Sequence, residues 1–294
     1  MHLPALFSRL SLCGHIGLAG AWLASLPAGA AAPTAPTVPT APEITLKEIT
    51  ELSETLQRQR AAEHAVQAAL TSWNATAAQR VQTYKDGPGR KRWQDAAQQV
   101  ARVRSNPPSP EAGQLWQALD AGVDAASGRN PLARATDPRS GDELAWSSAW
   151  LRHQVLQQHA DGRYSYAYAL NLSRLGRPGE YLMEVAIFLA HARLALQIDA
   201  DRCADTTLAM DVMAGYESQA HLRELDRAVK ALPPRQRATA VLEAIVIEET
   251  LGERPPLPWL CQAPKAPHWV DEAAWQAARR QRLQQATASL LRDL

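Results

Sequence analysis

The 294-residue sequence contains only two Phe residues, although nine Trp residues are present. Ala, Leu, Gln and Arg are abundant, and these residues lose little rotamer entropy in a helix, whereas β-branched and aromatic residues favour strands. The sequence therefore predicts an all-α protein. We expect a multi-helix array of antiparallel helix pairs, of which a solenoid is one form, with a long helix in the N-terminal part.

The chain also lacks a strong charge of either sign, because its formal net charge is +1. Such a chain has no general attraction for nucleic acid or for an anionic membrane. The predicted helix 90–105 has a basic face, but no aromatic residues alternate with its arginines to stack on bases. We interpret that face as solvated, and we expect no nucleic-acid partner.

Motifs of common enzyme classes are missing: the sequence has no phosphate-binding glycine loop, no His-Glu-x-x-His helix and no nucleophile elbow. Two catalytic candidates remain. Glu243 and Glu248 lie in an apolar helix predicted over 235–251, and a carboxylate buried there would have a raised pKa and serve as a general acid. Exported all-helical enzymes that cleave cell-wall glycans use such a glutamate, so an envelope polymer hydrolase is one alternative function.

Metal and cofactor sites have little support in the sequence. Glu184 and His191 share a helix face, but residues seven apart converge less well than ligands one turn apart. Asp199, Asp201 and Asp205 lack the Gly and the terminal Glu of a calcium loop, so capping and turn formation explain them better. We expect no metal and no cofactor, and absence of enzymatic activity is the favoured interpretation.

The apolar run at the N-terminus, residues 10–26, is shorter than the ~20 apolar residues that cross a bilayer. Arg9 precedes this run, and the small residues 28–30 follow it, which is typical of a secretory signal cleaved after Ala30. A retained membrane anchor is the alternative. We therefore expect a periplasmic or secreted protein with no integral membrane span after the signal is removed.

Cysteine is scarce as well, with three residues in the chain. Cys13 leaves with the signal, and Cys203 and Cys261 remain. In an oxidising compartment we expect these two to form a disulfide, with two separate buried thiols as the alternative. A zinc site would need two further ligands nearby.

Composition divides the chain into four segments, separated within the mature part by a polar stretch at 127–141. The segments are a signal peptide (1–30), a disordered spacer rich in Pro, Thr and Ala (31–42), an N-terminal helical region (43–127) and a C-terminal helical domain (142–294). We expect the spacer to be disordered because it cannot bury enough apolar surface to fold by itself.

A helix predicted over 43–84 carries an apolar seam. Ile49, Leu52 and Leu56 begin the seam, polar residues interrupt it, and Val66 and Leu70 resume it. Helices of this length often mediate self-association, but the interruption favours packing on the protein's own body. The sequence Lys-Asp-Gly-Pro-Gly at 85–89 predicts a turn after this helix.

Four aromatic residues are candidates for binding a sugar or a peptide. Trp146 and Trp150 lie one turn apart on a helix that Asp142 is expected to cap, and Tyr164 and Tyr168 follow on the next predicted helix. Sealing an interface between helices is the more frequent use of such residues, and we favour it.

Residues 163–205 predict a helix pair joined at a Gly-Arg-Pro-Gly break, where Gly176 adopts the left-handed conformation that ends a helix. With Leu172, Leu175 and Gly176 at its start and Ala-Leu-Gln-Ile-Asp-Ala-Asp at its end, this stretch resembles a tetratricopeptide-like or Sel1-like repeat. Phe188 stands where the repeat has a small Ala, and no second copy occurs at a fixed period. The resemblance implies helix-pair packing.

The leading hypothesis is an exported, helical binding or scaffold protein that contacts a protein partner in the cell envelope through a groove between helix pairs. An accessory component of a secretion or conjugation apparatus is the other alternative beside the hydrolase. In that case the helix over 43–84 would be the assembly element.

Overall fold

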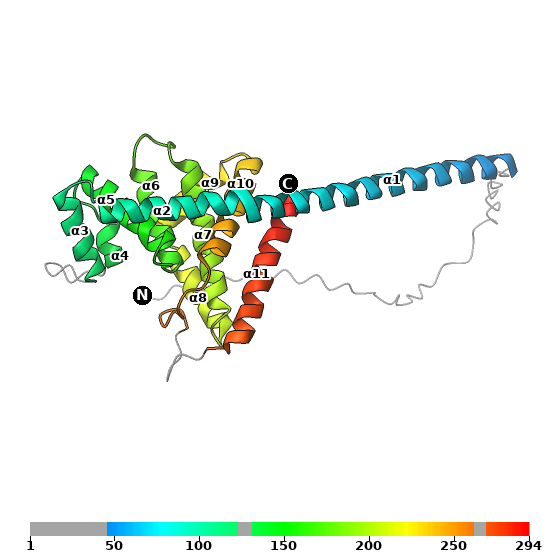
Figure 1. The fold of residues 1–294 in the computed structure, drawn as a ribbon. Coiled ribbons are helices and arrows are strands. Elements are labelled where there is room, and N and C mark those ends of the chain that lie inside the picture. Colours follow the sequence, from blue (N-terminus) through cyan, green and yellow to red (C-terminus); the bar gives the residue numbers. More distant parts are fainter. Residues whose placement is uncertain (1–45, 123–130, 262–268, 294) are drawn as a thin grey trace, which may run out of the picture. The chain divides into compact units, whose positions relative to one another are not determined.

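The computed structural model describes residues 46–122, 131–261 and 269–293, and these residues form an all-α protein (Figure 1). Within them there is no β-strand, only an isolated bridge between Cys203 and Trp269. None of the described helices combines the length and the apolar character needed to cross a membrane. The predicted signal peptide (1–30) and spacer (31–42) lie outside the described residues.

The elements are named here in chain order. They are α1 (Leu46–Tyr84), the π-helical turn η1 (Lys85–Gly89), α2 (Arg90–Ser105), α3 (Pro110–Asp120), α4 (Pro131–Ala135), α5 (Gly141–Leu156), α6 (Gly162–Arg174), α7 (Leu182–Ala200), α8 (Thr206–Glu217), α9 (Ala220–Lys230), α10 (Pro234–Leu251) and α11 (Glu272–Asp293). By contacts the chain divides into two units, 1–59 and 60–294, and the second contains the hydrophobic core.

Helices α6 and α7 form the antiparallel pair that the sequence predicts. Gly162 at the start of α6 lies so close to the later part of α7 that an added Cβ would be 2.5 Å from the carbonyl oxygen of Ala192. Further along α6, the ring of Tyr168 packs edge-on against that of Phe188, with 4.6 Å between centroids. Gly176 between the helices has φ of +65°, as expected for a residue that ends a helix in the left-handed conformation.

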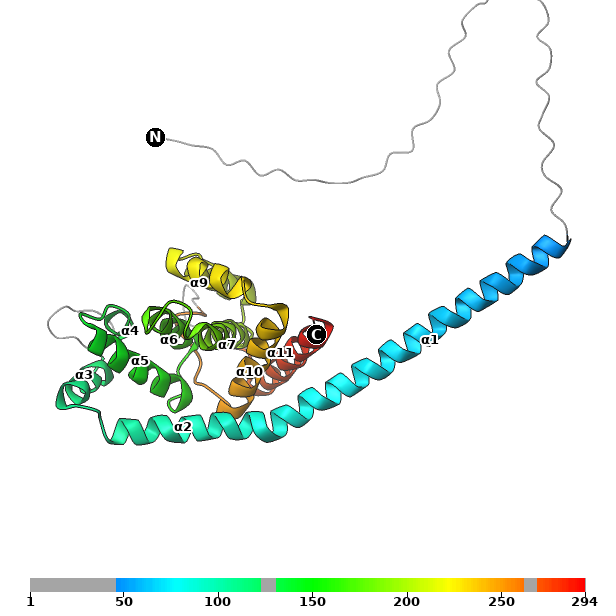
Figure 2. The same cartoon turned by 90° about the horizontal axis from the view of Figure 1, so that it is seen from above.

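The core surrounds α7, most of which is buried. Helix α10 packs along α7 and α11 packs on α10, while α5 packs on α6 and α2 packs on both α5 and α10. Figure 2 shows α2 passing beside α5 and α10. Trp93 of α2 and Trp116 of α3 join the same cluster as Trp150 of α5, so helices on both sides of the predicted 127–142 interval contribute to one core.

The turn predicted at 85–89 is wrong, because these residues form a π-helical turn that leads directly from α1 into α2. Pro88 has no N–H to donate, and a wider turn accommodates its ring where an α-helix would break. Gly89 makes this turn compact, since an added Cβ would lie 2.8 Å from the Tyr84 ring. Lys85 is buried here and pairs with Glu249 of α10 at 2.7 Å.

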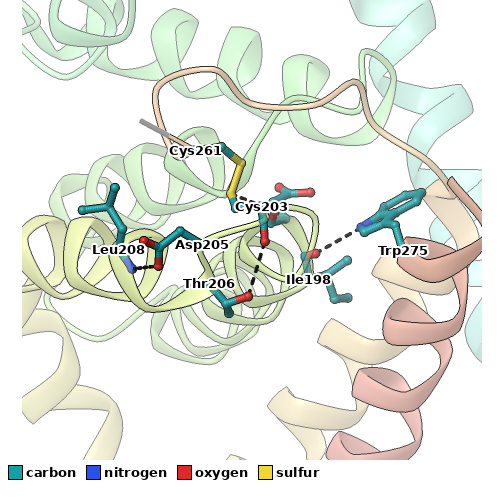
Figure 3. The surroundings of a disulfide bond; sticks show 8 residues. Ile198, Cys203, Asp205, Thr206, Leu208, Cys261 and Trp275 are labelled. Carbon is teal, nitrogen blue, oxygen red and sulfur yellow. Dashed lines mark hydrogen bonds between the residues drawn. A yellow bond between two sulfur atoms is a disulfide. The ribbon is translucent and has the colours of Figure 1, made fainter. Parts of the chain in front are cut away.

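Of the helix caps expected at Asp205 and Asp142, one is confirmed and one is wrong. The side chain of Asp205 accepts a hydrogen bond from the Leu208 N–H and caps α8 (Figure 3). Asp142 does not cap α5, because Ser140 is the N-cap and accepts from the Glu143 N–H. The prediction chose the charged residue over a serine that is an equally good cap two positions earlier.

A disulfide joins Cys203, just after α7, to Cys261 in the segment that follows α10, and this confirms the predicted pair (Figure 3). We call residues 252–261 the strap. Gly252 ends α10 with φ of +80°, and the Arg163 guanidinium lies 4.0 Å from the Trp259 ring centroid. In the chain-entropy estimate a bridge of this span stabilises the fold by about 4 kcal/mol.

Candidate functional site

The most concentrated group of polar side chains lies buried between α6, α7, α10 and the strap. The Oγ of Ser165 is 2.9 Å from Nδ1 of His191, whose Nε2 is 3.4 Å from Oε2 of Glu248. Arg254 of the strap donates from Nη1 to Glu248 at 2.7 Å and from Nε to Asp199 at 3.2 Å. All five side chains are nearly inaccessible to solvent, so we call them the buried polar cluster.

Charge in this cluster is balanced by pairing. Burial alone raises the pKa of Glu248, but Arg254 and His191 outweigh it and lower the pKa to about 2. Burial raises the pKa of Asp199 to about 6, although Arg254 acts against it. Burial also lowers the pKa of His191, which is therefore neutral at pH 7. The cluster thus contains an ionised Glu248–Arg254 pair beside an uncharged imidazole.

Three of these residues have the types found in a catalytic triad: Ser165 would be the nucleophile, His191 the base and Glu248 the orienting carboxylate. Such a triad acts only on a substrate that reaches the hydroxyl. Ser165, His191 and Glu248 are each 0 % exposed, so the hydroxyl is closed to solvent in this structure. Their contacts join α6, α7 and α10.

The raised pKa expected for Glu248 is wrong, because that expectation considered burial without Arg254. A general acid must hold a proton at working pH, and a carboxylic acid with a pKa near 2 does not. Arg279 also donates to the Glu248 main-chain oxygen at 2.8 Å.

Glu243, the second catalytic candidate, is buried and accepts from three donors. Trp93 Nε1 lies 2.6 Å from Oε2, Arg92 Nη1 lies 2.9 Å from Oε1, and the Tyr84 hydroxyl also donates to Oε1. These donors come from the end of α1 and the start of α2. Glu243 therefore connects α10 to the helical segment that passes over it.

The aromatic candidates separate into two kinds. Trp150 and Tyr168 are 2 % and 3 % exposed, and the Trp150 Nε1 donates to Asp120 at 2.8 Å. Trp146 and Tyr164 are half-buried, and the Tyr164 ring lies 5.9 Å from that of Trp150. The structure places Trp150 and Tyr168 in the core, while a binding role for the other two stays a prediction.

The acidic residues considered as metal ligands have separate partners. Glu184 accepts from the Tyr168 hydroxyl at 2.9 Å, Asp201 pairs with Arg282 at 2.6 Å, and Asp205 caps α8. In the part of the chain that the structure describes, no three His, Cys, Asp or Glu side chains converge as metal ligands.

A groove of about 620 Å³ opens between α7, α9, α10 and α11, and we call it the four-helix groove. Its apolar surface comes from large residues on all four helices and from several alanines. Arg193 and Lys230 at its rim both pair with Asp226, at 2.7 Å and 2.6 Å. Its lining includes Ala186, Leu189, Val229, Ala238, Val241, Ala286 and Leu290.

Sequence reasoning missed Arg254 and the lining of this groove. Arg254 stands at the start of a Pro-rich segment, where no apolar periodicity indicates that a side chain is buried. A signal for it existed, because Asp199 and Glu248 lie in apolar helices, and buried carboxylates require a cation.

Comparisons with protein-family models, with curated proteins and with solved structures gave no match for this chain. The resemblance of residues 163–205 to a tetratricopeptide-like repeat stays a prediction.

Proposed function

We propose that this protein is an exported helical scaffold whose four-helix groove binds an amphipathic helix of a partner in the cell envelope. The groove carries the proposal, because it combines an apolar surface with paired charges at the rim. Val241, a large apolar residue of α10 in the lining of this groove, is 36 % exposed. Amphipathic helices bind grooves of this kind through their apolar face.

The buried polar groups support a binding role over a catalytic one. Glu248 is ionised and paired, and Glu243 is saturated by three donors. Glu248 keeps no proton at working pH, and neither carboxylate has the open approach that polymer hydrolysis requires. We therefore do not propose the hydrolase.

Site-specific photocrosslinking in cells tests the groove. A photoreactive residue at position 241 should capture a protein partner. The same residue at position 239 should not, because Thr239 is exposed on the same helix but does not line the groove. Equal capture at both positions, or none at 241, would contradict the proposal.

The proposed export has its own test, which is the N-terminus of the mature protein. Cleavage after Ala30 should yield a chain that begins at Ala31 and fractionates with the periplasm or the medium. A chain that keeps its N-terminus and sediments with membranes would instead support a retained anchor.

A second candidate function, an accessory component of a secretion or conjugation apparatus, is favoured by exposed apolar residues on α1. Val66, Leu70 and Trp73 are at least half exposed. Removing residues 46–73 should abolish assembly into a larger complex. The cut must spare Val81 and Tyr84, since Val81 is buried and Tyr84 donates to Glu243.

A further inference from the structure

Helix α1 carries a row of large apolar side chains that its own chain leaves in solvent. Leu52, Leu56, Val66, Leu70 and Trp73 are between 46 % and 61 % exposed. They are four, ten, four and three residues apart, and these spacings all fit one heptad, so the five side chains lie on one face of the helix. Large apolar side chains left exposed along one helix face mark an interaction site.

We propose that α1 pairs with α1 of a second copy of this chain, antiparallel, about a two-fold axis at residue 61. In this register Leu52 lies opposite Leu70 of the partner copy, nine residues either side of the axis, and Leu56 lies opposite Val66, five residues either side. The polar residues that interrupt the seam, Gln59 and Glu63, are equidistant from the same axis. The row is therefore self-complementary, as an isologous interface requires.

The axis lies within the exposed part of α1. From residue 50 to residue 76 every side chain is exposed, whereas Ala77 is half-buried and Val81 is buried. An antiparallel partner centred on residue 61 therefore pairs along exposed helix, clear of the side chains that pack on the chain's own core.

Charge favours the antiparallel direction. Residues 46–57 contain three glutamates and one lysine, whereas residues 65–84 contain no acidic residue and one basic residue, Arg80. Antiparallel pairing places the glutamates of one copy along the acid-free half of the other. Parallel pairing would place glutamates beside glutamates, which is unfavourable.

A second groove lies where the partner helix would end. Ala69, Trp73, Thr76 and Arg80 of α1 line it together with residues 233–235, and its volume is about 1110 Å³. In the proposed register the first turn of the partner's α1 lies beside Trp73 and Thr76. Arg80 and Arg235 in this groove face the acidic end of the partner helix.

Cysteine crosslinking tests both the pairing and its direction. In the full mature chain Cys203 and Cys261 are bonded to each other, so any crosslink between copies forms through the introduced cysteines. The double variant Leu56→Cys with Val66→Cys should form a covalent dimer on mild oxidation, and so should a mixture of the two single variants. Each single variant should not crosslink with itself, because its thiols lie far from the axis.

The geometry excludes a link within one chain. Positions 56 and 66 are ten residues apart on a helix, about 15 Å, and a disulfide requires Cα atoms within about 7 Å. Crosslinking of each single variant with itself would show parallel pairing and overturn the register. Absence of any covalent dimer would overturn the proposal.

Analytical ultracentrifugation of the purified mature chain measures the dimer dissociation constant, and two matched substitutions in α1 test which face forms the dimer. Val66→Glu should raise the dimer dissociation constant at least tenfold. Ala68→Glu should leave it unchanged, since Ala68 is exposed on the opposite face of α1. Equal effects of the two substitutions, with helicity intact, would contradict the pairing. The result is independent of the four-helix groove, which a dimer and a monomer both retain.

Discussion

Residues 60–76 of α1 and the centre of the α7–α10 pair use side chains in opposite ways. The first region exposes Val66, Leu70 and Trp73, while the second buries Asp199, Glu248 and Arg254. Both choices are unfavourable for an isolated chain, because apolar surface is driven from water and charge is costly to bury. In the second region the cost is offset inside the chain, by ion pairs of 2.7 Å and 3.2 Å.

The difference indicates where a partner is needed. Each charge in the buried polar cluster has a counter-charge from its own chain, so the cluster is complete. The apolar face of α1 has no equivalent cover within residues 60–76, where every side chain is exposed. The buried charges of the polar cluster therefore indicate a structural role, and the exposed apolar side chains of α1 indicate a surface for binding another protein.

Removing Arg254 should give the largest effect, because it leaves two buried carboxylates without their cation. We expect Arg254→Ala to lower the free energy of unfolding by about 5 kcal/mol, as when one partner of a buried ion pair is removed. Urea denaturation followed by circular dichroism measures it. Arg227→Ala is the control, since Arg227 is exposed and 4.0 Å from Glu224, and it should change stability by less than about 0.5 kcal/mol. Similar losses in both variants would mean that the cluster does not depend on its ion pairs.

Removing the disulfide should give the next largest effect. The disulfide fixes one end of the strap, and Arg254 in the strap contributes the guanidinium of the buried polar cluster. Replacing both Cys203 and Cys261 with Ala should cost about 4 kcal/mol. Reduction of the wild-type protein should lower its melting temperature to a similar extent. Hydrogen exchange should increase first at residues 252–261. Unchanged exchange there would show that the strap is held by Arg254 and Trp259 alone.

Local features of this fold were predictable from the sequence, and long-range polar pairing was not. The spacing of apolar residues predicted α6, α7 and α10, and cysteine number predicted the disulfide. Residues 85–89 were misjudged because Gly and Pro usually mark a turn, while the contacts that support a π-helical turn there come from Glu249, far along the chain. Arg254 and Asp199 are likewise distant in sequence, and periodicity carries no information about such contacts. The candidate site was predicted by residue type at Glu243 and Glu248, but their donors were not.

Acid should weaken the buried polar cluster through Glu248. Its pKa is about 2 in the folded state, below the usual value of 4.5, so the unfolded chain binds more protons in between and stability falls as pH decreases from 4.5 to 2. We expect a loss of about 3 kcal/mol over this range. Asp199, whose pKa is raised from 3.8 to about 6, acts in the opposite direction between those two values, so the loss of stability is steepest below pH 3.8.

Urea denaturation at several pH values between 4.5 and 2 measures this loss. Glu248→Gln should be less stable throughout but should lack the additional loss. Glu224→Gln, at an exposed position, should keep the wild-type profile. A wild-type profile in Glu248→Gln would assign the acid sensitivity to other groups.

The same substitution made in the two regions gives the most direct comparison, and we expect the smallest effect of all in α1. Leu196→Ala in α7 removes a side chain that is 0 % exposed, and we expect a loss of 2 to about 5 kcal/mol. Leu70→Ala in α1 removes one that is 50 % exposed, and in dilute solution, where copies do not associate, the loss should stay below about 0.5 kcal/mol. At high protein concentration Leu70→Ala should also become destabilising, because association stabilises the folded state by mass action. If Leu70→Ala were as costly as Leu196→Ala in dilute solution, α1 would be packing on its own chain and would have no free face for a second copy.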